Sequence, residues 1–266
     1  MSNELQTQEN EMKPNYLSEI PKDSWGTDDL QQYISPSYVK ITQKQSSEPY
    51  SNYEVGTVLA VPQNIELFRP NQEFHITPVF FYTEFILANP YVLSNLSFIR
   101  ERSFDSNGEL AKHARDFNNR TVPCPEAPAG KEQQDKYQCT YFEHLNFLCL
   151  IEEHETFCEL PIVFTFRSGE FKTGKNLANL IALRRGPLYA CRFKCYSEAH
   201  KQGSESNYGF TISNPSEGSP WLVEERFNLT KELHAQFKEL HAKNLIQVAY
   251  ADEPAGDGTS AETPEM

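Results

Sequence analysis

The sequence predicts a mainly β fold: a small barrel with a minor helical part, a long polar insertion and disordered acidic ends. Three observations support this prediction. Short segments rich in β-branched and aromatic residues recur along the middle of the 266-residue chain, separated by turn-forming residues. Only two segments show the periodicity of an amphipathic helix. Both ends of the chain are acidic and have few apolar side chains to bury.

Seven segments are predicted as strands. The two longest are residues 74–87, where Pro78 requires an edge position or a bulge, and residues 139–151, whose length also suits a helix. The full set of predicted strands is 38–42, 56–61, 74–87, 139–151, 160–166, 188–196 and 208–212.

Two segments are predicted as helices. Residues 172–185 place Leu177, Leu180 and Ile181 on one stripe. A second stripe contains Leu229, Leu233, Phe237 and Leu240, with Thr230 as the N-terminal cap. Among β-rich architectures, the oligonucleotide-binding (OB) barrel fits this set of elements best.

The length favours one core domain with extensions. We expect a flexible acidic arm over residues 1–32, an OB-like core over 33–250 and a disordered acidic tail over 251–266. Residues 105–136 are polar and contain three prolines, so they are predicted as a structureless insertion between strands.

The chain is predicted to be cytoplasmic, without a membrane partner. Its apolar runs are far shorter than the roughly 20 residues of a membrane span. The amino-terminal residues have neither the basic start nor the apolar stretch of a secretory signal peptide. The six cysteines are therefore expected to be reduced thiols or metal ligands and not a disulfide framework.

The net charge of -13 conceals an uneven distribution. Residues 1–30 hold seven acidic side chains against two lysines, and residues 252–266 hold five acidic side chains and no base. Residues 167–201 instead carry eight lysines and arginines against two glutamates. An acidic total therefore does not exclude a nucleic-acid ligand, because the basic stretch is local.

Strand alternation divides this basic stretch into two faces. Tyr189, Cys191, Phe193 and Cys195 are predicted to point inward, and Arg192, Lys194 and Tyr196 outward. The same parity places Thr165 and Arg167 outward on the preceding strand, and Tyr38 and Lys40 outward on the first. Cations beside aromatic rings suit single-stranded nucleic acid, since cations follow phosphates and rings stack on bases. A solvated basic sheet face is the alternative.

Eleven residues form the predicted nucleic-acid-binding set. Phosphate contacts are predicted for Arg167, Lys172, Lys175, Arg184, Arg185, Arg192, Lys194 and Lys40, and stacking surfaces for Tyr38, Tyr82 and Tyr196.

Residues 169–176 also match the phosphate-binding pattern G-x-x-x-x-G-K between a predicted strand and a predicted helix. Asn176 stands where that motif has the magnesium-binding Ser or Thr, and no strand ends in a second metal-binding acid. A degenerate P-loop nucleotide-binding protein is thus a minor alternative. A plain strand-to-helix turn, in which the glycines supply backbone freedom, is the main interpretation of this segment.

No cofactor is predicted. Cys124 and Cys139 are the best zinc candidates, but no C-x-x-C pair accompanies them. No nucleophile elbow or zinc-protease motif occurs either, so the chain is predicted not to be an enzyme.

The order of segments resembles phage-encoded single-stranded DNA-binding proteins. The similarity spans about residues 34–250 and rests on ISPSYVKITQ (34–43), ELPIVFTFRSGEFKTGKNLANLI (159–181) and LYACRFKCYSEA (188–199). It implies an OB fold that coats single-stranded DNA without strong sequence preference during replication, recombination or repair. It also implies that the acidic tail recruits partner proteins or competes with DNA for the basic groove.

A second class of function stays open. A phage structural or assembly protein could use a β-rich core for protein contacts, with the basic stretch facing an acidic partner. A homo-oligomer is compatible with both classes.

Overall fold

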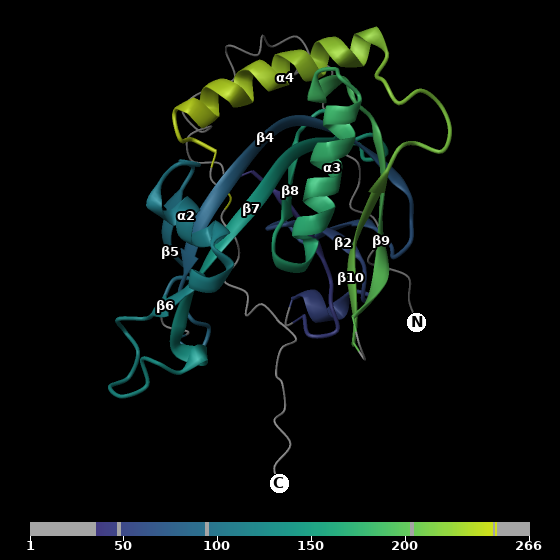
Figure 1. Ribbon diagram of the computed structural model, residues 1–266. Coiled ribbons are helices and arrows are strands. Elements are labelled where there is room, and N and C mark those ends of the chain that lie inside the picture. The colour runs from purple at the N-terminus through teal and green to yellow at the C-terminus, as the bar shows by residue number, and fades with distance from the viewer. Residues whose placement is uncertain (1–35, 47–48, 94–95, 203–204, 247, 249–266) are drawn as a thin grey trace, which may run out of the picture. The chain divides into compact units, whose positions relative to one another are not determined.

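The computed structural model of the protein describes residues 36–46, 49–93, 96–202, 205–246 and 248. Most of these residues belong to one mixed β-sheet with helices packed against it (Figure 1). The predicted arm (1–32) and tail (251–266) lie outside the described residues. The strands are β1 Tyr38–Ile41, β2 Val58–Val61, β3 Ile65–Phe68, β4 Phe74–Ala88, β5 Ile99–Ser103, β6 Thr121–Pro123, β7 Gln138–Ile151, β8 Ile162–Phe166, β9 Phe193–Gln202 and β10 Glu205–Ser213; the α-helices are α2 Glu109–Arg115, α3 Phe171–Leu183 and α4 Glu224–Ala242.

The sheet follows one main path, in the order β10, β9, β4, β7, β8, β1, β2, β3. β5 pairs with β4 and β6 with β7 beside this path. Neighbouring strands are antiparallel except β1 and β8, which are parallel through Tyr38 and Val163. The described sheet does not close, because its end strands β3 and β10 have no pairing with each other. A mainly β fold is confirmed, and the OB barrel stays a prediction.

Side chains span the gap between β10 and the strand β1. The Gln43 amide donates to the Tyr208 carbonyl oxygen at 2.8 Å and accepts from the Tyr208 N–H at 2.9 Å, as a neighbouring strand would. The helix α3 packs against both β8 and β10, and Thr173 donates to the Phe210 carbonyl oxygen at 3.4 Å. A helix and a side-chain amide thus hold the edges together where the backbone ladder is missing.

The sheet buries both of its faces. One cluster, under α3, contains Phe74, Phe164, Phe166 and Phe193 among other side chains. A second cluster lies between the opposite face and α4, and includes Leu148. Since β7 contributes to both clusters, its last five residues, 147–151, are apolar without a break.

Each of the seven predicted strands overlaps a strand of the sheet, whereas β3, β5 and β6 were not predicted. The pairing of β4 with β7 shifts register between Pro78 and Phe80, so the bulge expected at the proline is confirmed. Residues 188–190 form a 3-10 turn, and β9 begins only at Phe193. Tyr189 therefore is not a strand residue; its ring lies 4.7 Å from that of His234 on α4.

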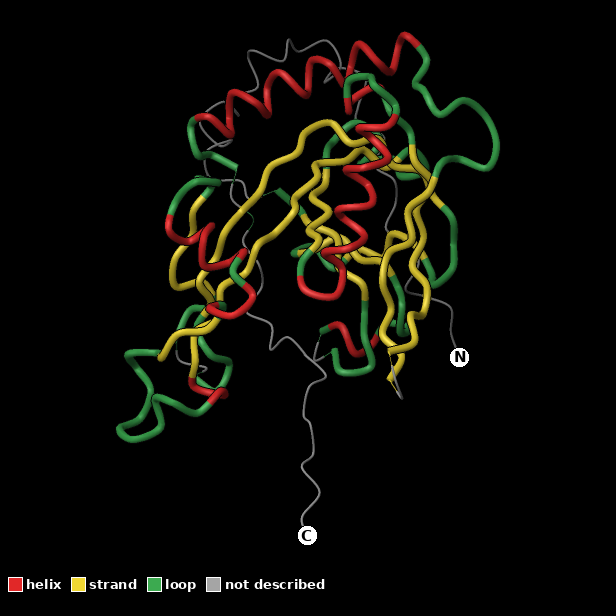
Figure 2. Tube along the Cα trace, in the orientation of Figure 1, coloured by secondary structure: helices red, strands yellow, loops and turns green. Residues whose placement is uncertain are grey.

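The insertion over residues 105–136 is not structureless, which corrects the sequence prediction. It contains α2, β6 and two 3-10 turns, and it packs beside the far halves of β4 and β7 (Figure 2). Ala111 and Ala114 of α2 are fully buried against Phe85. Small residues at a spacing of three let this short helix lie close to the sheet.

The helix α4 covers the second cluster with the predicted stripe, which confirms its amphipathic pattern. Thr230 is not its cap, because the helix begins six residues earlier, after Val223. The buried Thr230 hydroxyl instead donates to the Tyr189 carbonyl oxygen at 2.7 Å. Neither α4 nor any other helix in the described ranges is both long and apolar enough to cross a membrane.

Candidate nucleic-acid interface

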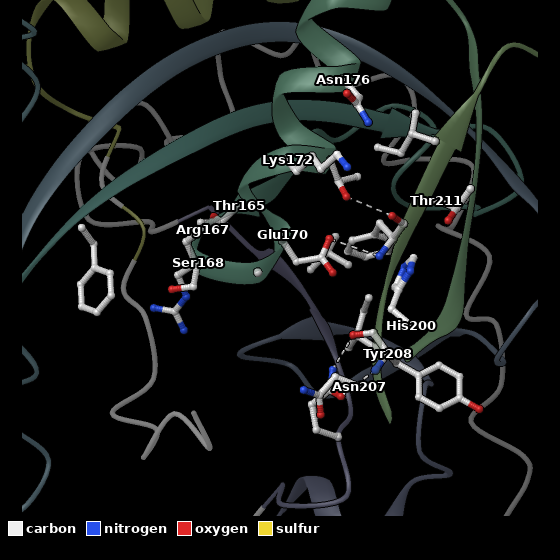
Figure 3. A pocket seen from close by; sticks show the side chains of 18 of the residues that line it. Thr165, Arg167, Ser168, Glu170, Lys172, Asn176, His200, Asn207, Tyr208 and Thr211 are labelled. Atoms are coloured by element: carbon white, nitrogen blue, oxygen red, sulfur yellow. Dashed lines mark hydrogen bonds between the residues drawn. The ribbon is translucent and has the colours of Figure 1, made fainter. Parts of the chain in front are cut away.

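A cleft of about 840 Å³ opens where the sheet fails to close, between β1, β8, β10 and the first turn of α3 (Figure 3). Arg167 and Lys172, two of the predicted phosphate-binding residues, line it. Four aromatic residues line it as well: Tyr91, Phe142, Tyr208 and Phe210. The cleft therefore combines cations with rings, which is the combination that the sequence predicted for a nucleic-acid surface.

The turn between β8 and α3 positions both cations. β8 ends at Phe166, and the backbone then turns through Ser168, whose φ of 44° lies in the left-handed region. α3 begins at Phe171, so Lys172 and Asn176 are four residues apart on the face that borders the cleft. The positive end of the helix dipole adds to the charge of Lys172.

Glu170 is the carboxyl group that lines the cleft. One of its oxygens accepts a hydrogen bond from the Phe210 N–H at 3.2 Å. Burial nevertheless raises its pKa to about 7, outweighing this hydrogen bond, which lowers it. Gly209 lets the Glu170 carboxyl group lie close to the β10 backbone, since a Cβ at this position would collide with Glu170 and lie 2.8 Å from His200 Cδ2. Near neutral pH the carboxyl group is therefore partly protonated, and the cleft keeps a positive balance.

Lys40 is coupled to this cleft through Arg167. Burial, followed by the repulsion of the Arg167 guanidinium, lowers the pKa of Lys40 to about 8. Its ammonium group lies 4.1 Å from the centroid of the Tyr50 ring. An anion placed between the two cations would relieve their repulsion.

An aromatic stack extends the cleft on the side of Arg167. The Tyr91 and Phe98 rings are stacked with centroids 5.5 Å apart, and the Arg167 guanidinium lies 5.9 Å from the Phe98 centroid. Tyr91 keeps 39% of its surface exposed. It therefore offers a ring face to a base next to a cation for the phosphate.

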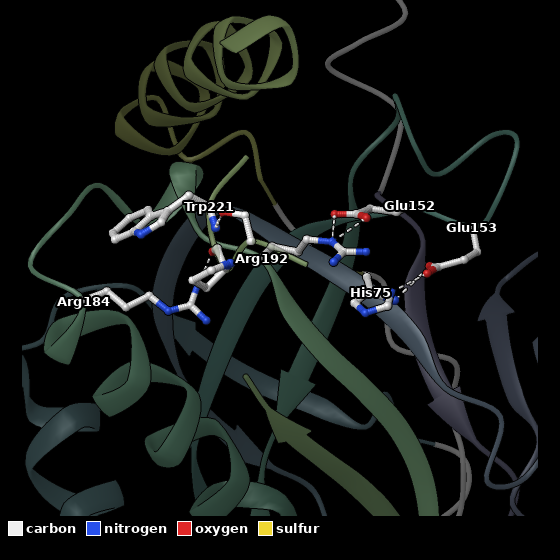
Figure 4. Close-up of polar contacts among 8 residues, drawn as sticks. His75, Glu152, Glu153, Arg184, Arg192 and Trp221 are labelled. Atoms are coloured by element: carbon white, nitrogen blue, oxygen red, sulfur yellow. Dashed lines mark hydrogen bonds and ion pairs between the residues drawn. The ribbon is translucent and has the colours of Figure 1, made fainter. Parts of the chain in front are cut away.

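Three predicted cations lie elsewhere, in a group that we call the β9 basic cluster: Arg184, Arg192 and Lys194. Figure 4 shows Arg184 and Arg192. Arg192 pairs with Glu152 at 2.7 Å, and Lys194 pairs with Glu73 at 2.8 Å. Arg184 donates to the Pro220 carbonyl oxygen and to Asn214, both at 2.6 Å. These side chains hold protein elements together.

Lys175 and Arg185 are exposed but do not line the cleft. Lys175 lies on another face of α3, with its ammonium group 4.7 Å from the Phe171 ring centroid. Arg185 follows the helix with a φ of 52°, in the left-handed region.

Two of the three predicted stacking residues are buried. Tyr38 is 8% exposed and Tyr82 is 4% exposed, and both belong to the cluster under α4. The expectation that they point outward is corrected, because α4 covers this face of the sheet. Tyr196 is partly exposed and lies 5.8 Å from the Lys194 ammonium group, in contact with the β9 basic cluster and not with the cleft.

The P-loop interpretation is wrong for this segment. A phosphate-binding loop needs its glycines in an open turn before the helix, yet Gly174 and Lys175 lie inside α3. Gly174 is buried against β8, where a Cβ would come within 2.6 Å of Phe166 Cβ. The glycine permits close packing of helix on strand and leaves no loop for phosphates.

The cysteines predicted as zinc candidates are buried thiols. Cys124 donates to Glu126 at 3.1 Å, and burial together with a hydrogen bond to Cys124 raises the pKa of Cys139 to about 11. A raised pKa opposes the thiolate form that zinc requires. Across the described ranges, the cluster with three possible ligands is His75, Glu152 and Glu153. In this cluster His75 is hydrogen-bonded to Glu153, and Glu152 accepts from Arg192 (Figure 4).

Sequence reasoning missed the aromatic side of the cleft. Tyr91 and Phe98 lie in the segment between β4 and β5, and Phe142 lies in β7. The available signal was the pair of aromatic residues in a loop, where an apolar side chain has little local reason to occur. Comparisons with protein-family models, curated proteins and solved structures found no match to this chain.

Proposed function

We propose that the protein binds single-stranded DNA, without strong sequence preference, in the cleft between β1, β8, β10 and α3. The observation that carries this proposal is that Arg167 and Lys172 line one open cleft together with four aromatic residues. The protein would act by coating exposed strands, not as an enzyme.

The charge distribution in the cleft supports phosphate binding. Lys172 is exposed and makes no ion pair with the residues that the structure describes. The repulsion between Arg167 and Lys40 favours an incoming anion. Glu170 opposes a phosphate least when it is protonated, at or below about pH 7.

Ring faces support sequence-tolerant binding, because every base has a face that can stack. Tyr91 is exposed, and its ring stacks on Phe98, which in turn lies next to the Arg167 guanidinium. Asn207 and Asn176 also line the cleft and offer hydrogen bonds to base edges or phosphates.

The proposal includes an open OB-type barrel. Its support is the position of α3 over the gap and the bridge that Gln43 makes to β10. It also includes a cytoplasmic role in replication, recombination or repair, with partner proteins recruited by the acidic tail over residues 251–266.

The decisive experiment measures the binding of a labelled single-stranded oligonucleotide of about 30 bases by fluorescence anisotropy at several salt concentrations. For Arg167→Gln with Lys172→Gln we expect affinity to fall about tenfold or more at low salt. The negative slope of log affinity against log salt should become shallower by about 1.4, since each lost phosphate contact on a single strand contributes about 0.7 to its magnitude.

A matched control changes the same charge elsewhere. Lys231 and Lys238 are exposed on α4, so Lys231→Gln with Lys238→Gln should leave affinity and slope nearly unchanged. Equal losses in both double variants, or no binding by the unmodified protein at low salt, would refute the cleft as the binding site.

A protein-contact role is the second candidate, and one surface favours it. Leu183, Trp221 and Val223 expose 78%, 40% and 68% of their surfaces around the end of α3 and the start of α4. A protein with this role alone would elute at low salt from immobilised single strands, whereas a single-strand binder would be retained until the salt is raised.

A further inference from the structure

A second pocket, of about 390 Å³, lies on a different face of α3 from the cleft. The helix residues Phe171, Lys175 and Ala178 form one wall. The insertion contributes Arg115 and Arg120, and the sheet contributes Phe81, Glu143 and Leu145. Small-molecule sites usually measure about 300–1,000 Å³, so this space suits one compact ligand.

The charge of this pocket is positive. Three cations, Arg115, Arg120 and Lys175, stand against the single carboxylate Glu143. Arg115 is already engaged by Glu143 at 3.2 Å and by the Ser106 carbonyl oxygen at 2.8 Å. That leaves Arg120 and Lys175 to meet a ligand, and neither forms an ion pair with a described residue.

Arg120 lines this pocket with hydrogen-bonding capacity left unused. Its Nε is buried and has no hydrogen-bond partner among the residues that the structure describes. Buried donors in native proteins almost always have an acceptor, because an unsatisfied one loses its hydration without compensation. Arginine presents its N–H groups in a fork that matches the oxygens of a phosphate.

An aromatic wall accompanies these cations. Phe81 is 37% exposed, although it lies in the middle of the longest strand of the sheet, whose neighbouring residues are mostly buried. The Phe147 ring supports it from the core side, with centroids 4.6 Å apart. A ring held in place from behind and open in front offers a surface for a planar base.

We propose that this pocket binds one nucleoside monophosphate unit, with the phosphate at Arg120 and Lys175 and the base against Phe81. The unit can be a free nucleotide or one nucleotide of a strand, since both present the same phosphate and base. The site is separate from the cleft and does not depend on the function proposed for it.

The test is isothermal titration of the full chain with 2′-deoxyadenosine 5′-monophosphate, alongside deoxyadenosine and inorganic phosphate. The monophosphate should bind more tightly than either part. Arg120→Gln should weaken it about tenfold or more, and Lys175→Gln by a smaller factor. Lys231→Gln is the matched control, because it removes the same charge from an exposed position on α4 that lines neither this pocket nor the cleft, and it should change affinity less than about twofold.

Competition identifies the source of the unit. Displacement of the monophosphate by an oligothymidine strand assigns the pocket to the strand, and simultaneous binding assigns it to a free nucleotide. Undetectable binding at about 1 mM ligand would overturn the proposal, as would equal affinity of the wild type, Arg120→Gln and Lys175→Gln. If Arg120→Gln does not fold, Lys175→Gln provides the test, because Lys175 is exposed. Failure here leaves the anisotropy result for the cleft unaffected, so the two proposals can fail separately.

Discussion

The cleft and the β9 basic cluster derive their cations from the same basic stretch of sequence but use them differently. In the cleft, Lys172 is exposed and makes no ion pair with a described residue, and Arg167 borders a stack of two rings. In the β9 basic cluster, Arg192 and Lys194 each contact a carboxylate from a distant part of the chain. The difference teaches that one run of basic residues can serve two roles, since carboxylates from distant parts of the chain tie Arg192 and Lys194 to the protein itself.

The same anion meets different conditions in these two regions. A phosphate at Arg192 has to compete with Glu152, which accepts two hydrogen bonds at 2.7 and 2.9 Å. A phosphate in the cleft would instead relieve the Arg167 repulsion that, after burial, lowers the pKa of Lys40. Binding should therefore concentrate in the cleft even though both regions are rich in arginine and lysine.

The largest expected effect comes from Glu170→Gln. The pKa of Glu170 is raised from 4.5 to about 7 in the fold, so its protonated form is favoured there. This contribution to stability is fully present below about pH 4.5 and is lost as the pH rises through about 7. At pH 8 the glutamine variant should be more stable by up to about 3 kcal/mol, since one pKa unit corresponds to about 1.4 kcal/mol. Urea unfolding at pH 5 and pH 8 measures the difference.

The pH 5 arm serves as the control for Glu170→Gln, because a protonated carboxyl and an amide are both neutral. Strand binding at pH 8 should also strengthen in this variant, since one negative charge leaves the cleft. A stability difference that is the same at both pH values would contradict a carboxyl group titrating near neutrality.

A smaller effect is expected from Arg192→Gln with Lys194→Gln. This double variant should lower the free energy of unfolding by about 1–2 kcal/mol, because it leaves the half-buried Glu152 without its partner. Strand affinity should change less than about twofold, in contrast to the cleft variant. Urea unfolding and anisotropy on the same samples separate the two effects, with the exposed pair Lys231 and Lys238 as the control. An affinity loss as large as that of the cleft variant would remove the distinction between the two regions.

Sequence reasoning identified local features of these regions well. Strand alternation correctly placed Phe164 and Phe166 in the core and Thr165 and Arg167 at the cleft. The apolar stripe of α3 and the bulge at Pro78 were likewise predictable, because each depends on neighbouring residues.

The sequence could not predict which residues far apart along the chain contact each other. Lys194 and Glu73 are 121 residues apart, and nothing in either segment indicates that they pair. The burial of Tyr82 has the same origin, since the α4 residues that cover it come about 150 positions later. The cleft itself arises because β10 and β1 approach each other without a backbone ladder, and no local pattern encodes that gap.

The smallest expected effect concerns Tyr82→Phe, which separates the buried face of the sheet from the cleft. The Tyr82 hydroxyl is buried and has no hydrogen-bond partner within the described part of the chain, so its removal should be neutral or stabilise the fold by up to about 1 kcal/mol. Strand affinity should not change. Tyr53→Phe is the matched control, because the Tyr53 hydroxyl donates to the Asn64 carbonyl oxygen at 2.6 Å and its loss should cost about 1 kcal/mol. Weaker strand binding in Tyr82→Phe, measured by anisotropy beside thermal unfolding, would mean that α4 uncovers this face when DNA binds.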